Sequence, residues 1–179
     1  IMVQTALVPS AIDQIWQADI TYVRLGQAFV YLAVVLDSFS RKVVGWALED
    51  HLEASLAIAA LDMALTTRNP IPGSLIHHSD RGIQYACQDY KKRLTTHDIA
   101  ISMSRAGNPY DNAKVESFMK ALKAEEVNAK AYTTFEHARS DIGSFLETFY
   151  NNTRLHSSLG YQSPNAFEAK IKPYKTKKP

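Results

Sequence analysis

Three acidic residues occupy positions from which the carboxylates of separate structural elements can meet. Asp19 is central in "WQADITYV", Asp80 directly follows "SLIHH", and Glu116 lies in "NPYDNAKVESFMKALK". Mg²⁺ prefers oxygen ligands, and only a few of them need to come from the protein. Two such ions about 3.5 to 4 Å apart activate a nucleophile on one side of a phosphorus and stabilise the leaving oxygen on the other. The residue types therefore suggest metal-dependent phosphoryl transfer.

The spacing of these acids is weak support by itself. Asp80 and Glu116 have 35 residues between them, a separation typical of polynucleotidyl transferases. The same separation occurs in three other pairs, namely Asp13 with Glu49, Asp89 with Glu125, and Asp111 with Glu147. Only Asp80 with Glu116 places one acid at a strand end and the other just inside a helix that follows a loop, so the order of elements favours this pair.

The elements that must position the acids are expected to be strands first, then strands alternating with helices. Residues 16–23 alternate between apolar and polar side chains, which predicts a half-buried strand with Asp19 on its polar face. Two further apolar runs separated by turns complete an antiparallel meander. The later runs alternate helix and strand, which implies parallel pairing with right-handed crossovers. The expected further strands are 29–36, 43–48, 74–78 and 99–103, and the expected helices are 52–67 and 87–96.

Two more helices are expected in the second half. The first begins near Asp111, which we interpret as its cap. Its core-facing stripe is Val115, Phe118, Met119 and Leu122, and a neighbouring face carries Glu116, Lys120 and Lys123. A capping box from Thr133 to Glu136 begins the second helix, whose apolar side is Ala138, Ile142, Phe145, Leu146 and Phe149.

Composition narrows the class of protein. With 46% hydrophobic residues in 179, the chain is long enough for one sizeable core but not for two full domains. The single cysteine, Cys87, excludes an internal disulfide, and no apolar run reaches the roughly 18 to 20 residues of a membrane span. Five lysines lie in the last ten residues, and the rest has 15 basic against 18 acidic residues. Binding of a polyanion must therefore use local patches or metals.

Five sequence motifs along the chain resemble those of a known family. They are "WQADITYV", "YLAVVLDSFSRKVVGWAL", "IHHSDRGIQYA", "SMSRAGNPYDNAKVESFMKALKAEEV" and "FYNNTRLHSSLGYQSPNAFE". Together, and in this order, they resemble the catalytic domain of DDE transposases of the retroviral-integrase type, in the insertion-sequence group typified by IS-three. The first residue is Ile, so we expect a fragment or a processed chain.

The resemblance implies an α/β, RNase H-like fold, the retroviral integrase catalytic core, with a mixed five-stranded sheet and flanking helices. It implies that Asp19, Asp80 and Glu116 hold two Mg²⁺ or Mn²⁺ ions. Water then cleaves the element end, and the exposed 3′ hydroxyl attacks a target phosphodiester. The expected organisation is a catalytic core with a C-terminal helical extension over residues 1–168 and a flexible lysine-rich tail over 169–179.

The resemblance also implies contacts with DNA. Lys123 fills the family's basic position seven residues after its glutamate, and we expect it to meet phosphate beside the metals. Lys120 is a candidate for the same role, with a merely solvated side chain as the alternative. Asn108, Tyr110 and Asn112 lie in the preceding loop, where they either hold a splayed strand or serve turn chemistry.

Other polar residues receive plainer interpretations. Asp37 begins a hairpin and is interpreted as a turn residue. His77 and His78 are adjacent in a strand and point to opposite faces, so they are not expected to share one metal ion. Arg154 and His156 belong to one of the five motifs, and the sequence alone does not assign them a role.

The expected partners are the DNA of the element ends and of the target, with a homodimer or higher assembly and no membrane. The family's upstream helix-turn-helix has no counterpart in these residues, so hydrolytic nicking or strand transfer on pre-processed ends is the expected activity. We expect a cytoplasmic, nucleoid-associated bacterial protein. The alternatives are an RNase H-like nuclease or a non-catalytic DNA-binding fragment of a transposase.

Overall fold

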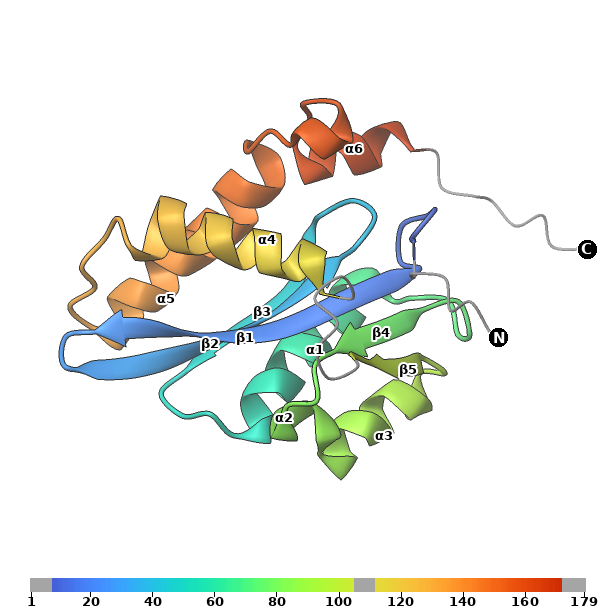
Figure 1. Cartoon of the computed structure of the whole chain (residues 1–179), viewed down its shortest axis with the longest axis horizontal. Helices are drawn as coiled ribbons and strands as arrows, with labels where there is room; N and C mark the ends of the chain where they lie inside the picture. Colours follow the sequence, from blue (N-terminus) through green and yellow to red (C-terminus); the bar gives the residue numbers. More distant parts are fainter. Residues whose placement is uncertain (1–7, 105–111, 172–179) are drawn as a thin grey trace, which may run out of the picture.

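The protein, seen as a computed structural model that describes residues 8–104 and 112–171, is built on one five-stranded sheet (Figure 1). In space the strands lie in the order β3-β2-β1-β4-β5. The first three form an antiparallel meander, whereas β4 runs parallel to β1 and β5 parallel to β4. The mixed sheet predicted from the sequence is confirmed. The strands are β1 (Ile15–Leu25), β2 (Ala28–Asp37), β3 (Val43–Glu49), β4 (Ile76–Ser79) and β5 (Ala100–Met103).

Helices cover both faces of the sheet (Figure 1). One face packs against α4 and α5, and the other against α1, α2 and α3. None of the helices in the described ranges combines the length and the apolar composition that a membrane span needs. The helical elements are α1 (Ala54–Arg68), α2 (Ile83–Ala86), α3 (Gln88–Thr96), α4 (Ala113–Leu122), η1 (Lys123–Val127), α5 (Phe135–Ser144), η2 (Phe145–Tyr150), η3 (Ser157–Leu159) and α6 (Pro164–Lys170).

The alternation of side chains in β1 and β2 divides the core into two layers. In β2, Val34 and Leu36 pack toward α4 and α5, whereas Ala33 and Val35 pack toward α1. This strand is buried on both faces, as its continuous apolar run predicts. In β1, Trp16 and Ala18 face the α1 side, which leaves the intervening positions to face α4. The strand therefore directs the side chain of Asp19 toward α4.

Three local details differ from the sequence-based expectations. The N-cap of α5 is Thr134, whose hydroxyl accepts a hydrogen bond from the His137 N–H at 3.1 Å, so the capping box placed at Thr133 is wrong by one residue. In η2 the helix widens to π geometry, which rotates later residues around the axis. As a result Tyr150 is buried and Phe149 is 42% exposed, contrary to the expected stripe. The N-cap of α4 is Asn112, and Asp111 lies outside the described residues.

The register between β1 and β4 sets the positions of two acids. Gln17 lies level with His78 in this parallel pair. Pairing ends there, and β4 ends at Ser79, so Asp19 and Asp80 both lie just beyond the last paired residues of β1 and β4. Neighbouring strands are about 4.8 Å apart, so the fold brings the two acids to one edge.

Candidate active site

Asp19 lies at the centre of β1, level with Val34 of β2. Its side chain is partly buried. One carboxylate oxygen, Oδ1, accepts a hydrogen bond from the N–H of Ile20 at 2.8 Å, which fixes the orientation of the group. The polar face of this strand, predicted from its alternation, thus carries an acid that is oriented but only partly hydrated.

Asp80 follows the last residue of β4 and begins a tight turn. Its Oδ1 accepts a hydrogen bond from the N–H of Gly82 at 2.7 Å. A Cβ atom at position 82 would lie 2.8 Å from that same oxygen, so the turn leaves no room for a side chain there. The strand before the turn is held by His78, whose ring nitrogens lie 2.9 Å from Ser102 Oγ and 3.0 Å from Ser104 Oγ. The exposed Asp80 carboxylate is therefore carried by a fixed backbone.

Glu116 is exposed in the first turn of α4, and two hydrogen bonds fix that turn to the sheet. The side-chain oxygen of Gln17, from β1, accepts a hydrogen bond from the N–H of Val115 at 3.1 Å. Lys114 Nζ donates to the backbone oxygen of Ser38 at 2.8 Å. Because Gln17 and Asp19 point to the same face of β1, the first bond places Glu116 near Asp19. Sequence reasoning missed this role of Gln17, although its position two residues before Asp19 was a usable signal.

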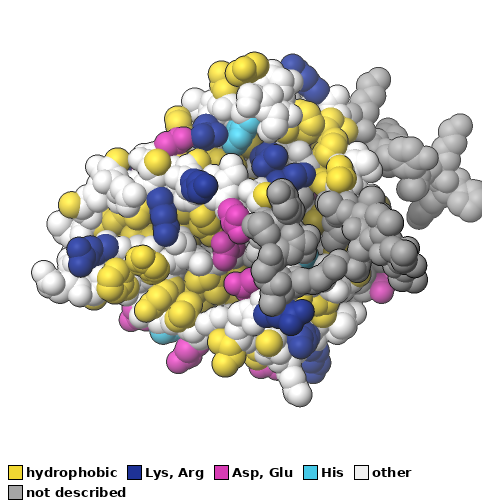
Figure 2. Space-filling view, in the orientation of Figure 1, with side chains coloured by type: hydrophobic (Ala, Val, Ile, Leu, Met, Phe, Trp, Pro, Cys, Tyr) yellow, Lys and Arg dark blue, Asp and Glu magenta, His cyan; other side chains and the backbone are white. Residues whose placement is uncertain are grey.

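The charges of both other predicted acids act on Asp19. The pKa of Asp19 is raised to about 6, chiefly by burial and also by the charges of Asp80 and Glu116, against the opposing effects of the Ile20 N–H and Lys123. None of the ion pairs among the described residues includes Asp19, Asp80 or Glu116. In Figure 2, acidic side chains gather in the middle of this face. The negative charges of these three side chains are therefore not neutralised by an ion pair with a described basic residue.

A buried tyrosine lies beneath the acids. Tyr85, from α2, is 3% exposed, and within the described ranges its hydroxyl has no hydrogen-bond partner. Burial raises the pKa of this hydroxyl well above its usual value, and Asp19 and Asp80 raise it further. It is thus a neutral donor within the field of two carboxylates. Sequence reasoning missed it, although it lies in the motif "DRGIQYA", which also contains Asp80.

The residues predicted to contact DNA fall into three groups. Lys120 is exposed on α4, and Lys123 has its Nζ 4.9 Å from the centre of the Tyr22 ring. Asn112 is only 8% exposed, and its side-chain oxygen is buried without a partner among the described residues. Asn108 and Tyr110 lie outside the described residues. Contact of these five residues with DNA remains a prediction.

The two adjacent histidines have separate partners. His77 is fully buried, with its Nε2 2.8 Å from the hydroxyl of Tyr90, whereas His78 contacts the serines of β5. Burial lowers the pKa of His77 to about 3, so its ring is neutral at physiological pH. Both rings therefore pack and hydrogen-bond within the sheet.

Asp37 caps its turn, as predicted, by accepting hydrogen bonds from the N–H groups of Phe39 and Ser40. The two residues left without a role, Arg154 and His156, lie where the last helices meet. Arg154 binds Glu125 of η1 through two nitrogens at 2.7 to 3.0 Å, and His156 packs against Tyr150. They join η1 to the segment after η2.

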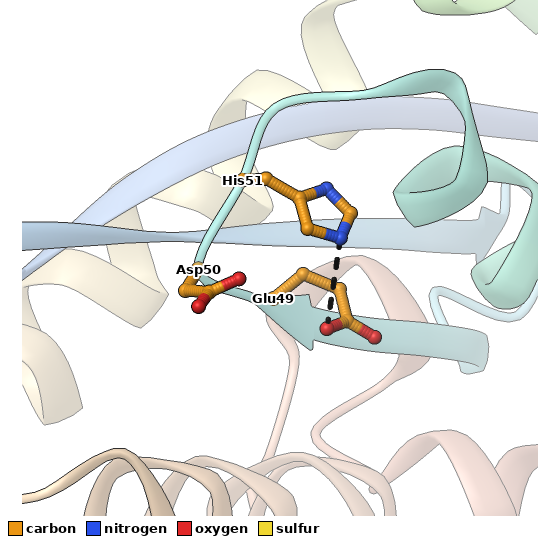
Figure 3. Close-up of side chains that lie close together, drawn as sticks. All are labelled: Glu49, Asp50 and His51. Carbon is orange, nitrogen blue, oxygen red and sulfur yellow. Dashed lines mark ion pairs between the residues drawn. The ribbon is translucent and has the colours of Figure 1, made fainter.

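A second group of possible metal ligands lies elsewhere. Glu49, Asp50 and His51 have ligand atoms that all lie within 4.8 Å of one another, at the end of β3 (Figure 3). Glu49 and His51 face each other at 4.0 Å and are 41% and 37% exposed. Asp19, Asp80 and Glu116 do not form so tight a group within the described part of the chain. Mutual repulsion spreads unpaired carboxylates, and two ions about 3.5 to 4 Å apart do not require all ligands to converge on one point.

The chain is similar to known proteins in sequence and in structure. A family model described as "Integrase core domain" matches residues 9–109, more than half of the chain, and a second model with the same description matches residues 97–164. A transposase for insertion sequence element IS904 from Lactococcus lactis is 42% identical over 89% of this chain and 62% of its own length. The transposase InsF for insertion sequence IS3A from Escherichia coli is 43% identical over 88% of this chain and 54% of its own length. The chain thus spans about half to three-fifths of these relatives.

Solved structures agree on the fold. The integrase catalytic core domain of HTLV-2, solved in complex with magnesium, has a TM-score of 0.65 at 17% identity over 91% of this chain and 99% of its own. A chain of the simian T-cell lymphotropic virus intasome has a TM-score of 0.72 at 21% identity over 93% of this chain and 60% of its own. The predicted RNase H-like fold is confirmed. With two family models along its length and this fold, the chain belongs to the integrase core domain family.

Proposed function

We propose that this chain is the catalytic core of a DDE transposase that cuts DNA strands and joins a 3′ hydroxyl to target DNA. The observation that supports the proposal is that Asp80, after β4, and Glu116, in α4, both act electrostatically on Asp19 of β1, and none of the three has a cationic partner among the described ion pairs. The kinship to insertion-sequence transposases adds support, because those relatives are named for this activity.

The three carboxylates are the right donors for two Mg²⁺ or Mn²⁺ ions. Hard divalent ions take oxygen ligands, and Asp19, on which the charges of both other acids act, is proposed as the ligand that both ions share. The raised pKa of Asp19 reflects burial first and the charges of Asp80 and Glu116 after it, and bound cations would favour the ionised carboxylate against both. When bound, the ions would activate a water or 3′ hydroxyl and stabilise the leaving oxygen. The number of ions is part of the proposal.

The remaining chemistry belongs to the chain. Strand transfer breaks one phosphodiester P–O bond and forms another, so no energy source is consumed. The residues therefore need only to orient the attacking and leaving oxygens in line and to hold the DNA. Lys123 is proposed to bind a phosphate beside the acids, since its charge already acts on Asp19. Gln17 and the turn at Gly82 hold the acids at fixed positions.

We also propose the wider setting. DNA of the element ends and of the target is the partner. More than one chain is proposed to assemble on it, and the likeness to a chain of the simian virus intasome supports this. The relatives come from bacteria, and the cytoplasm, where bacterial DNA lies, is the proposed location. The lysine-rich end, residues 169–179, is proposed as a basic tail beyond the core.

A strand-transfer assay tests the proposal. The chain is mixed with Mn²⁺, a target plasmid and a duplex that carries the terminal sequence of its element, already cut to expose the 3′ hydroxyl. We expect joined product. Cleavage of an RNA–DNA hybrid without joining would instead support an RNase H-like nuclease. Binding of DNA with neither reaction would support a non-catalytic fragment.

A further inference from the structure

The hairpin of β1 and β2 carries two exposed aromatic side chains beyond the acids. Tyr22 is 59% exposed and Phe29 is 44% exposed. Their rings meet edge to face, with centroids 5.3 Å apart, across a diagonal of the strand pair. In the described part of the chain, β1 pairs with β4 only as far as Gln17, so this half of β1 has an open edge. The rings are therefore available on a surface that no other described strand covers.

Cations lie over both rings. Lys123 Nζ is 4.9 Å from the centre of the Tyr22 ring, and Arg24 Cζ is 5.8 Å from the centre of the Phe29 ring. Neither cation takes part in an ion pair between described residues, whereas Arg93, Lys130 and Arg154 all do. Two positive charges thus sit on aromatic faces without a carboxylate to neutralise them.

Three of these four residues, without Phe29, border a hollow in the surface. Tyr22, Arg24 and Lys123 line a space of about 590 Å³ together with Asn128 and Tyr132, from the segment that follows α4. A space of this size lies in the range of pockets that hold small ligands of nucleotide size. The Tyr22 ring and the charges of Arg24 and Lys123 are groups that bind a nucleotide, whereas Lys130, a third cation of the lining, is paired with acids.

The hollow continues the proposed active site. Lys123 acts electrostatically on Asp19 and also contacts Tyr22, so one side chain joins the two regions. Asp19 and Tyr22 are three residues apart on β1, about 10 Å along the strand, and alternation directs their side chains to opposite faces, so Lys123 links the two regions across the open edge of β1. Figure 2 shows Lys and Arg side chains beside the central acidic group, next to an apolar band.

We propose that Tyr22, Phe29, Arg24 and Lys123 form a binding surface for unpaired DNA beside the phosphate that reacts. Bases would stack on the rings, and the cations would contact the backbone phosphates. Paired bases inside a duplex are closed off by their neighbours, so ring stacking selects nucleotides released from the duplex near an end. The inference rests on the proposed function, because it takes DNA as the substrate of the adjacent acids.

Binding of two DNA hairpins tests the surface. One hairpin has a blunt end and the other has the same stem with a five-nucleotide single-stranded extension, and fluorescence anisotropy without divalent metal gives both affinities. The wild type should prefer the extended hairpin. Tyr22→Ala should weaken binding of the extended hairpin about 10-fold and of the blunt hairpin less than about 2-fold, since a stacked base contributes about that factor. Tyr22→Phe, which keeps the ring, should retain the preference.

Matched variants separate stacking and charge from general effects. Phe29→Leu should weaken the extended hairpin selectively, whereas Phe149→Leu, at a ring of similar exposure elsewhere, should not. Arg24→Gln should lower the slope of log affinity against log salt by about one, and Arg139→Gln, at an exposed arginine of α5, should leave it unchanged. Thermal melting checks that each variant folds.

The outcomes distinguish this inference from the proposed function. Equal losses on both hairpins, or no loss in Tyr22→Ala, would overturn the surface while leaving a DNA-joining enzyme intact. Absence of binding to either hairpin by the wild type would contradict both. A selective loss with Tyr22→Ala that Tyr22→Phe avoids would support the surface, whatever the joining assay gives.

Discussion

Two groups of acidic residues lie near β1, and they differ in whether basic side chains form ion pairs with them. Asp13, Asp37 and Glu168 surround Arg68, which contacts Asp13 at 2.8 Å and Glu168 at 2.8 and 3.0 Å through two nitrogens. Lys42 adds a further cation 3.6 Å from Glu168. Asp19, Asp80 and Glu116 have no such partner among the described ion pairs, and only Lys123 acts favourably on Asp19 from a side chain.

The difference assigns different roles to similar residues. The first group ties the start of β1, the end of β2, α1 and α6 together, so its charges are structural. In the second group like charges raise one another's energy, a cost that persists in a fold only where something else offsets it. Divalent ions held during catalysis are the offset that we propose.

The largest effect on stability is expected from removing Arg68, the cation that Asp13, Asp37 and Glu168 share. Arg68→Ala removes the shared cation, which leaves Asp37, fully buried, without an ion-pair partner among the described residues and leaves Glu168 with Lys42 alone. The free energy of unfolding should fall by about 3 to 5 kcal/mol, the range for a buried pair that loses one partner. Urea unfolding followed by circular dichroism measures it. Arg93→Ala removes an ion pair to Asp62 in which both side chains are 44% exposed, and it should cost less than about 1 kcal/mol.

A smaller change in stability, of opposite sign, is expected from removing the charge of Asp19. The pKa of Asp19 is about 6 against an ordinary 3.8. Between these values the folded protein keeps a proton that the unfolded chain has released, so stability falls as pH rises through this window and stays lower above it. In metal-free protein at pH 7.5, Asp19→Asn should therefore raise the free energy of unfolding by about 2 kcal/mol after allowance for partial exposure.

The gain from Asp19→Asn should vanish below about pH 4, where the acid is protonated in both states. Urea unfolding at pH 3.5 and 7.5 compares the two regimes. A gain of equal size at both pH values would mean that the substitution acts through packing and not through charge.

The smallest of these stability effects comes from filling the unpaired site. Mn²⁺ at ten times its dissociation constant should stabilise the wild type by about 1.4 kcal/mol, because it binds the folded state. Asp19→Asn should abolish this stabilisation, measured as a shift in melting temperature. Glu49→Gln, in the other group of possible ligands, should leave it unchanged. Loss of the shift in Glu49→Gln but not in Asp19→Asn would move the metal site to the end of β3.

The sequence was sufficient for local patterns and insufficient for long-range pairing. Alternation in residues 16–23 placed Asp19 on a strand face, and the order of elements selected Asp80 and Glu116 over three decoy pairs with equal spacing. The π geometry of η2, which exchanges Phe149 for Tyr150 in the core, has no local sequence pattern that separates it from an α-helix. The partners of Arg68 lie 55 and 100 residues away, so only the tertiary structure pairs them.

The most direct test of the central claim is strand transfer by Asp80→Asn beside Asp89→Asn. Asp89 is an exposed acid of α3 that belongs to one of the decoy pairs, so both variants lose the same charge from the surface. With a pre-cut element end, a target plasmid and Mn²⁺, Asp80→Asn should give no joined product, with an unchanged melting temperature in the absence of metal. Asp89→Asn should give as much product as the wild type. Undiminished strand transfer by Asp80→Asn would contradict the assignment of Asp19, Asp80 and Glu116 as the catalytic acids.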